Sequence, residues 1–192
     1  MAIPAQGGHY WDVRLFAGIP LPQNVRDHVA RALDMVHPAQ RAARNPWIPS
    51  VNWHITLAFY GEQPEGMVDQ LVENIQAAAR ETAPFELGLA GAGVFHQEVC
   101  WIGLSDSAEV LGPLAQKVRG SYTSGDQHTK NRFHLTVSRA GRHGGLADAM
   151  SALSVYRGPV WTADHICLFH STLGQGVGGH PLYKVLARVP LG

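Results

Sequence analysis

Hydrophobic and polar positions alternate along two short segments of the chain that share one pattern. Residues 54–58 have the sequence HITLA, and residues 134–138, which begin 80 positions later, have the sequence HLTVS. In both segments a histidine and a threonine alternate with aliphatic residues, which is the period of a β-strand with one polar face. We therefore expect the histidine and the threonine of each strand to point the same way.

The remaining segments predict further strands, helices and loops. Apolar residues three or four positions apart predict helices over 22–36, 65–80, 108–122 and 146–155. Apolar or alternating runs predict strands over 13–19, 53–60, 85–92, 99–104, 132–139, 160–161, 165–171 and 183–189. Polar or glycine-rich stretches predict a hairpin turn over 91–97 and loops over 38–50, 123–131 and 174–179.

The order of these elements predicts the architecture. No linker interrupts the 192 residues, so we expect a single domain over 1–192. Strands and helices interleave, and each half of the chain contains one histidine strand. This arrangement predicts an α+β (mixed α/β) fold of two pseudo-symmetric lobes. Antiparallel-rich sheets would line a central cleft, and the helices would lie outside.

Composition and charge narrow the classes of function. Hydrophobic residues make up 45% of the chain, and charged residues, at 16%, fall below the usual quarter, which indicates a compact globular protein rather than a disordered one. The formal net charge is +0, which disfavours a dedicated duplex-binding protein. Six basic residues stand against one acidic residue between 117 and 142, and this local excess favours an RNA end or a nucleotide as the partner.

The cysteines and the hydropathy of the chain indicate where in the cell the protein is located. Cys100 and Cys167 lie in apolar runs, so we expect buried, reduced thiols. Residues 1–11 have no secretory pattern, and no apolar run approaches the ~20 residues that a membrane span needs. We expect a cytoplasmic protein without a membrane segment or an obligate protein partner, and a monomer.

The chain has eleven histidines, so the two in the shared pattern need to be weighed against the rest. A third His-x-Thr triplet, at 170–172, leads directly into the glycine-rich loop and serves as the control. The alternative for His54 and His134 is a structural role inside the sheet, which explains one copy more easily than two matched copies. No HExxH, paired CxxC, GxSxG or carboxylate cluster is present, so we predict no metal site and no serine hydrolase.

Several segments carry a resemblance to a known family. RLFA at 14–17, HITLAFYGE at 54–62, FHLTVSR at 133–139, residues 168–173 and YKVL at 183–186 are similar to its signatures. The chain resembles the two-histidine phosphoesterases, in particular the bacterial and archaeal RNA 2',3'-cyclic phosphodiesterases, also called 2'-5' RNA ligases. Phe133 stands where that family often has proline, and 123–131 has no match in it. The resemblance implies a bilobal fold and hydrolysis of 2',3'-cyclic phosphates to 2'-phosphates without a metal or other cofactor, with reversible 2'-5' ligation as a further activity.

The chemistry of that reaction suits two histidines. Opening a cyclic phosphodiester needs a base for the attacking water and an acid for the departing ribose oxygen, and imidazole serves as either near neutrality. The resemblance implies that His54 is the proton donor and His134 the proton acceptor, although the sequence alone does not fix this direction. Thr56 and Thr136 would donate hydrogen bonds to the phosphate oxygens. A pair of this kind predicts a bell-shaped pH dependence with an optimum near neutrality.

Substrate contacts are expected close to both motifs. Arg139 would face away from His134 on a regular strand, unless a bulge after Thr136 redirects it. Its match to the family makes it the expected phosphate contact, and a surface arginine is the alternative. Tyr60 and Phe133, together with the tryptophans at 47 and 53, are candidates for stacking on a base, with core packing as the alternative.

Two other functions remain open at this point. One is the same chemistry on a different cyclic or 2'-5'-linked nucleotide, such as ADP-ribose 1'',2''-cyclic phosphate. The other is a non-catalytic module that binds a nucleotide or an RNA end. Two intact His-x-Thr motifs argue against the second function, because binding alone does not require an acid and a base.

Overall fold

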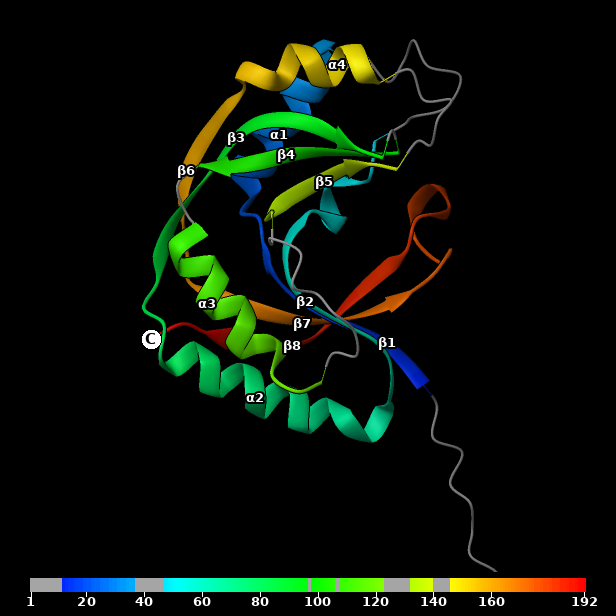
Figure 1. The fold of residues 1–192 in the computed structure, drawn as a ribbon. Coiled ribbons are helices and arrows are strands. Elements are labelled where there is room, and N and C mark those ends of the chain that lie inside the picture. The colour runs from blue at the N-terminus through cyan, green and yellow to red at the C-terminus, as the bar shows by residue number, and fades with distance from the viewer. Residues whose placement is uncertain (1–11, 37–46, 97, 106–107, 123–131, 140–145) are drawn as a thin grey trace, which may run out of the picture.

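The computed structural model describes residues 12–36, 47–96, 98–105, 108–122, 132–139 and 146–192 (Figure 1). These residues form eight strands, which are β1 (Asp12–Pro20), β2 (His54–Pro64), β3 (Phe85–Phe95), β4 (Val99–Ser105), β5 (His134–Ser138), β6 (Arg157–Ala163), β7 (His165–Thr172) and β8 (Leu182–Pro190). They also form four α-helices, which are α1 (Gln23–Val36), α2 (Val68–Arg80), α3 (Ala108–Arg119) and α4 (Ala147–Ala152). The α+β prediction is confirmed.

All eight described strands belong to one curled sheet with the order β6-β3-β4-β5-β2-β1-β7-β8, and every neighbouring pair is antiparallel. The two histidine strands, β2 and β5, are neighbours at its centre and are joined through the single pair Ile55 and Leu135. Each histidine strand therefore begins a four-stranded half. The two expected lobes are the halves of one continuous sheet rather than two separate sheets.

The helices divide between these halves, and Figure 1 shows α1 and α4 at one end of the molecule and α2 and α3 at the other. Helix α1 packs on β6 and α4 on β3, whereas α2 packs on β7 and β8, and α3 on β2. The buried face of α1 consists of Val25, Val29 and Leu33, which lie one turn apart. None of the described helices is long and apolar enough to cross a membrane.

Two glycines that were expected to end a strand or open a turn lie inside strands instead. Gly61 (φ 73°) adjoins a register shift in β2, and Gly91 (φ 66°) adjoins one in β3. Such shifts are β-bulges, and glycine adopts their left-handed backbone without strain. Strand β2 therefore continues to Pro64, and β3 continues to Phe95, which moves the hairpin turn from the expected 91–97 to the residues after 95.

Other expected boundaries also move. Helix α3 ends at Arg119 rather than at 122, and α4 is a short helix followed by a 3-10 turn (Leu153–Val155). Strand β6 begins at Arg157, three positions before the expected residue 160. The expected loop over 123–131 and most of the one over 38–50 lie outside the described residues.

Each histidine strand also has a bulge at the same place in its motif. The pairing of β2 with β1 skips Leu57, and the pairing of β5 with β4 skips Val137. Both residues directly follow the motif threonine. An extra residue reverses the alternation of faces beyond it, so the side chain three positions after each threonine shares the threonine's face.

Candidate active site

The four motif side chains gather at the centre of the sheet. Because Ile55 lies opposite Leu135 in antiparallel strands, His54 faces Thr136 and Thr56 faces His134 on the same side. Ile55 and Leu135 point to the other side, where both are fully buried in the core. The two histidines and two threonines therefore form a polar square with the imidazoles at diagonal corners. The opposite face of the sheet packs on the hydrophobic core.

One hydrogen bond of the same kind orients each imidazole. His54 Nδ1 donates to the carbonyl of Asn52 at 2.7 Å, and His134 Nδ1 donates to the carbonyl of Arg132 at 2.6 Å. A carbonyl oxygen only accepts, so Nδ1 holds the proton in the neutral ring and Nε2 keeps its lone pair. Neither Nε2 has a hydrogen-bond partner among the described residues. Each ring can thus accept or donate a proton at Nε2.

A pocket of about 350 Å³ opens beside this square on the His54 side. Its lining includes His54, Thr56 and Thr136, whereas His134 is not among the lining residues. The bulges bring two further residues into the lining, Phe59 and Arg139, each three positions after a motif threonine. The bulge at Val137 thus turns Arg139 toward the face of the sheet that carries His134 and Thr136.

The same bulges explain why another expected contact is wrong. Tyr60 is 5% exposed, and its hydroxyl donates to the Val118 carbonyl at 2.8 Å on the core side of the sheet. Burial raises the pKa of Tyr60 far above its ordinary value. Its neighbour Phe59 reaches the pocket instead and lies under the Arg14 guanidinium, 4.6 Å from ring centre to Cζ.

The other expected stacking residues do not line the pocket either. Phe133 packs against the hydrophobic core, and Trp47 and Trp53 are buried within it. For these three residues the alternative, core packing, is the better description. Cys100 and Cys167 are buried free thiols, as expected.

Aromatic rings surround His54. The centroid of its imidazole lies 4.6 Å from that of Phe16, 5.5 Å from that of Tyr183 and 5.9 Å from that of Phe169. Gly18 permits this packing, because a Cβ there would lie 2.8 Å from the Ile55 carbonyl oxygen and 3.3 Å from the His54 ring. The pKa of His54 is lowered to about 4, chiefly by burial; the nearby charges of Arg139 and His134 contribute to the lowering, and the hydrogen bond to the Asn52 carbonyl opposes it.

The surroundings of His134 are more open. Its described ring contact is an edge contact with Phe95, with centroids 5.1 Å apart. Burial lowers the pKa of His134, the charge of Arg139 adds to this, and the hydrogen bond to the Arg132 carbonyl opposes it. Near pH 7 both rings are therefore mainly neutral in the free protein. A bound anion would raise both pKa values.

Several residues of this pocket were not predicted from the sequence. Arg14, Phe16, Asn52, Ser171 and Tyr183 all line it. Arg14 and Phe16 alternate on β1 as the motif residues do on their strands, which was the available signal. His170, the control, does not line the pocket.

No group of three or more His, Cys, Asp or Glu side chains among the described residues is arranged to hold a metal ion.

Known proteins are similar to this chain in sequence and in fold. The sequence model of the 2'-5' RNA ligase superfamily matches residues 23–179. A Thermus thermophilus protein named RNA 2',3'-cyclic phosphodiesterase is 34% identical over 193 residues, with 93% of this chain and 90% of that protein covered. An Aquifex aeolicus protein of the same name is 31% identical over 157 residues, with 76% and 81% covered.

Solved structures of E. coli LigT share the fold. The apo form has a TM-score of 0.74 at 22% identity, covering 94% of this chain and 98% of that chain. The complex with 3'-AMP has a TM-score of 0.72 at 22% identity, with the same coverage.

Proposed function

This chain belongs to the 2'-5' RNA ligase superfamily, and from that premise we propose that it hydrolyses RNA or nucleoside 2',3'-cyclic phosphates to 2'-phosphates. The observation that carries the proposal is the matched pair of imidazoles on adjacent strands. Each is held at Nδ1 by a backbone carbonyl and has a free Nε2. The relatives named RNA 2',3'-cyclic phosphodiesterase support the same substrate class.

The reaction assigns one proton transfer to each ring. His134 Nε2 takes a proton from water as the water oxygen attacks phosphorus. The bond from phosphorus to the 3' oxygen breaks, and His54 Nε2–H gives its proton to that oxygen. The products are a 2'-phosphate and a free 3'-hydroxyl, and each transfer typically contributes about 10²–10⁴-fold to the rate.

The phosphate is held by neighbours of the two rings. Thr56 and Thr136 alternate with the histidines around the polar square and donate hydroxyl hydrogen bonds to the non-bridging oxygens. Arg139 lines the same pocket, and its charge acts on the pKa of both histidines, so it is close enough to pair with the phosphate. Both interactions strengthen as negative charge develops on those oxygens.

Binding of the substrate phosphate also favours protonation of His54, the proposed acid. The free protein has His54 mainly neutral at pH 7, because burial lowers its pKa to about 4. An anionic phosphate placed against the ring favours the protonated form and raises that pKa. The proton needed on His54 is therefore taken up with the substrate.

The remainder of the pocket suits a nucleoside. Its volume of about 350 Å³ lies in the range of small-molecule sites. Phe59 and Tyr183 offer aromatic surface for a base, and E. coli LigT has been solved in complex with 3'-AMP. We propose that nucleotides or RNA ends with a 2',3'-cyclic phosphate are the partners and that no metal or other cofactor takes part.

The test is hydrolysis of 2',3'-cyclic AMP in the presence of EDTA, with the product isomer identified by chromatography. We expect 2'-AMP at an unchanged rate, and no product from the double variant H54A/H134A. Activity that EDTA abolishes and a divalent ion restores would contradict metal independence. A 3'-AMP product would contradict the proposed leaving oxygen, and binding without turnover would favour the non-catalytic alternative.

A further inference from the structure

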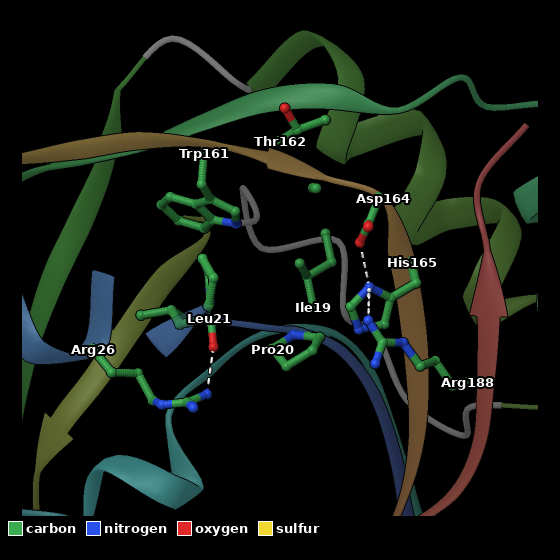
Figure 2. Close-up of a pocket in the computed structure, with 11 residues that line it drawn as sticks. Ile19, Pro20, Leu21, Arg26, Trp161, Thr162, Asp164, His165 and Arg188 are labelled. Atoms are coloured by element: carbon green, nitrogen blue, oxygen red, sulfur yellow. Dashed lines mark hydrogen bonds and ion pairs between the residues drawn. The ribbon is translucent and has the colours of Figure 1, made fainter. Parts of the chain in front are cut away.

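A second pocket of about 350 Å³ lies at the end of β1 (Figure 2). It is formed where the last residues of β1 and the first turn of α1 meet the β6–β7 turn and β8. None of its lining residues also lines the histidine pocket. The proposed reaction leaves this pocket without a role.

The floor of this second pocket is apolar. Ile19 and Leu21 are each 1% exposed and Trp161 is 7% exposed, yet all three line the open space. An apolar floor combined with a few polar groups at the opening is the usual composition of a small-molecule site. A compact apolar or planar group would fit against it.

The opening of the second pocket is cationic. Figure 2 shows the guanidinium groups of Arg26 and Arg188 on opposite sides of Pro20. Arg26 is held in place by hydrogen bonds to the Leu21 carbonyl and the Gln23 side chain, both at 2.5 Å. These two bonds use only some of its five N–H groups, and the others remain available to a ligand.

The acidic group at the opening is already hydrogen-bonded to a neighbour. Asp164 is the one acidic residue in the lining, and its carboxylate is bonded to His165 Nδ1. Two arginines against one aspartate leave the lining with a positive charge even when His165 is neutral. Helix α1 starts beside the pocket, has no acidic residue in its first turn and directs the positive end of its dipole there.

One buried donor in this pocket has no partner. Trp161 Nε1–H makes no hydrogen bond to any described group. Figure 2 shows the nitrogen edge of this indole on the side of the ring that faces Ile19 and Asp164. The indoles of Trp53 and Trp101 are also unpaired, but neither residue lines either pocket. A buried donor without an acceptor is unfavourable, and an oxygen carried by the organic group of a ligand would relieve it.

We propose that the second pocket binds a small phosphate monoester, with the phosphate between Arg26 and Arg188 and its organic group on the Ile19–Leu21–Trp161 floor. The two guanidinium groups come from α1 and β8 and approach from different sides. A tetrahedral phosphate has three terminal oxygens that accept from separate directions, whereas a planar carboxylate has two in one plane. The site is separate from the catalytic pocket and does not depend on the function proposed for it.

The test follows the indole N–H signal of Trp161 in a ¹H–¹⁵N spectrum, assigned with Trp161→Phe. Phenyl phosphate and 5'-AMP are the probes, and inorganic phosphate and adenosine separate the contributions of the charge and the organic group. We expect both monoesters to shift the signal saturably and to bind more tightly than inorganic phosphate. A stronger effect of 5'-AMP than of phenyl phosphate would identify a nucleotide as the ligand, and the reverse order would identify a non-nucleotide monoester.

Arginine variants decide whether the pocket is responsible. Arg26→Gln and Arg188→Gln should each weaken binding about tenfold or more, because each removes a charge-assisted contact. Arg31→Gln, on the exposed side of the same helix, should change nothing. The proposal is overturned by an unshifted Trp161 signal at probe concentrations on the order of 10 mM, by equal affinity in all three variants, or by adenosine binding as tightly as 5'-AMP.

Discussion

The two histidine half-sites are built from the same parts but sit in different surroundings. Each has a strand with a His-x-Thr motif, a bulge directly after the threonine, and a hydrogen bond from Nδ1 to the carbonyl two residues earlier. His54, however, is enclosed by the rings of Phe16, Phe169 and Tyr183, whereas the described ring contact of His134 is with the edge of Phe95.

The carbonyls that hold the two rings are also supported differently. The Asn52 side chain is buried and donates to the Pro181 carbonyl at 2.8 Å, which ties the start of β2 to the β7–β8 connection. The side chain of Arg132 is exposed, and its guanidinium lies over the Trp101 ring at 5.5 Å. The His54 half is therefore the more enclosed and the more firmly anchored.

A repeated motif therefore does not fix the protonation state of its residues. Burial lowers the pKa of His54 to about 4, and it also lowers that of His134. An acid and a base must differ in protonation when the reaction starts. In the free protein the more enclosed His54 has a pKa of about 4, so it becomes the acid only when the bound phosphate raises that pKa.

The largest effect is expected from removing either ring. His54→Ala and His134→Ala should each reduce turnover of 2',3'-cyclic AMP by about 10²-fold or more, because each removes one proton transfer. The melting temperature should show that both variants still fold. His170→Ala is the matched control and should retain near-native activity, since His170 does not line the pocket. Near-native activity in either of the first two variants would show that the residue takes no part in proton transfer.

A smaller effect is expected from the two threonines. Thr56→Val and Thr136→Val keep the shape of the side chain and remove its hydroxyl. Each should lower kcat/KM by about tenfold, on the order of one hydrogen bond to a charged group. Thr172→Val is the control, because Thr172 belongs to the third His-x-Thr triplet and does not line the pocket. A loss as large as that of the histidine variants would mean that the threonines take part in proton transfer.

The smallest effect on rate is expected from the neighbouring rings. Substituting them tests most directly whether enclosure sets the difference in pKa between His54 and His134. Phe16→Leu should raise the pKa of His54 toward its ordinary value, because it opens the imidazole to water. Phe95→Leu should change the pKa of His134 less, since only an edge contact is lost. Titration of the histidine Cε1–H signals measures both. Equal shifts in the two variants would show that enclosure does not distinguish the half-sites.

Local patterns in the sequence were sufficient for the motif residues but not for their neighbours. Period-2 alternation placed His54 and Thr56 on one face, as it did for the second motif. It failed one residue beyond each threonine, because the bulges at Leu57 and Val137 have no sequence signal of their own. Tyr60 was therefore chosen where Phe59 lines the pocket, and Arg139 reached the pocket only through a bulge.

The pairing of distant strands could not be predicted from local patterns in the sequence. The two histidine strands meet through one pair, Ile55 and Leu135, and nothing in either segment specifies that partner. The aromatic enclosure of His54 combines β1, β7 and β8, and the rings come together only when those strands pair. That enclosure lowers the pKa of His54, and local patterns in the sequence do not reveal it. The sequence therefore predicts a pH optimum near neutrality, whereas the lowered pKa values predict a more acidic one.

The pH dependence of kcat/KM on 2',3'-cyclic AMP tests the acid–base pair most directly. This parameter depends on the free enzyme, in which one imidazole must be protonated and the other neutral. Both free pKa values lie below the usual imidazole value, with that of His54 at about 4. Activity should therefore rise as pH increases through the lower pKa and fall as pH increases through the higher one. The limbs belong to the coupled pair rather than to either residue.

We expect a bell-shaped profile for kcat/KM with its optimum between about pH 4 and 6.5. The profile for kcat should be a bell displaced to higher pH, because the bound phosphate raises both pKa values. A flat profile, or one that rises steadily to high pH, would mean that hydroxide or a metal-bound water attacks phosphorus. Either result would contradict the assignment of the acid and the base to His54 and His134.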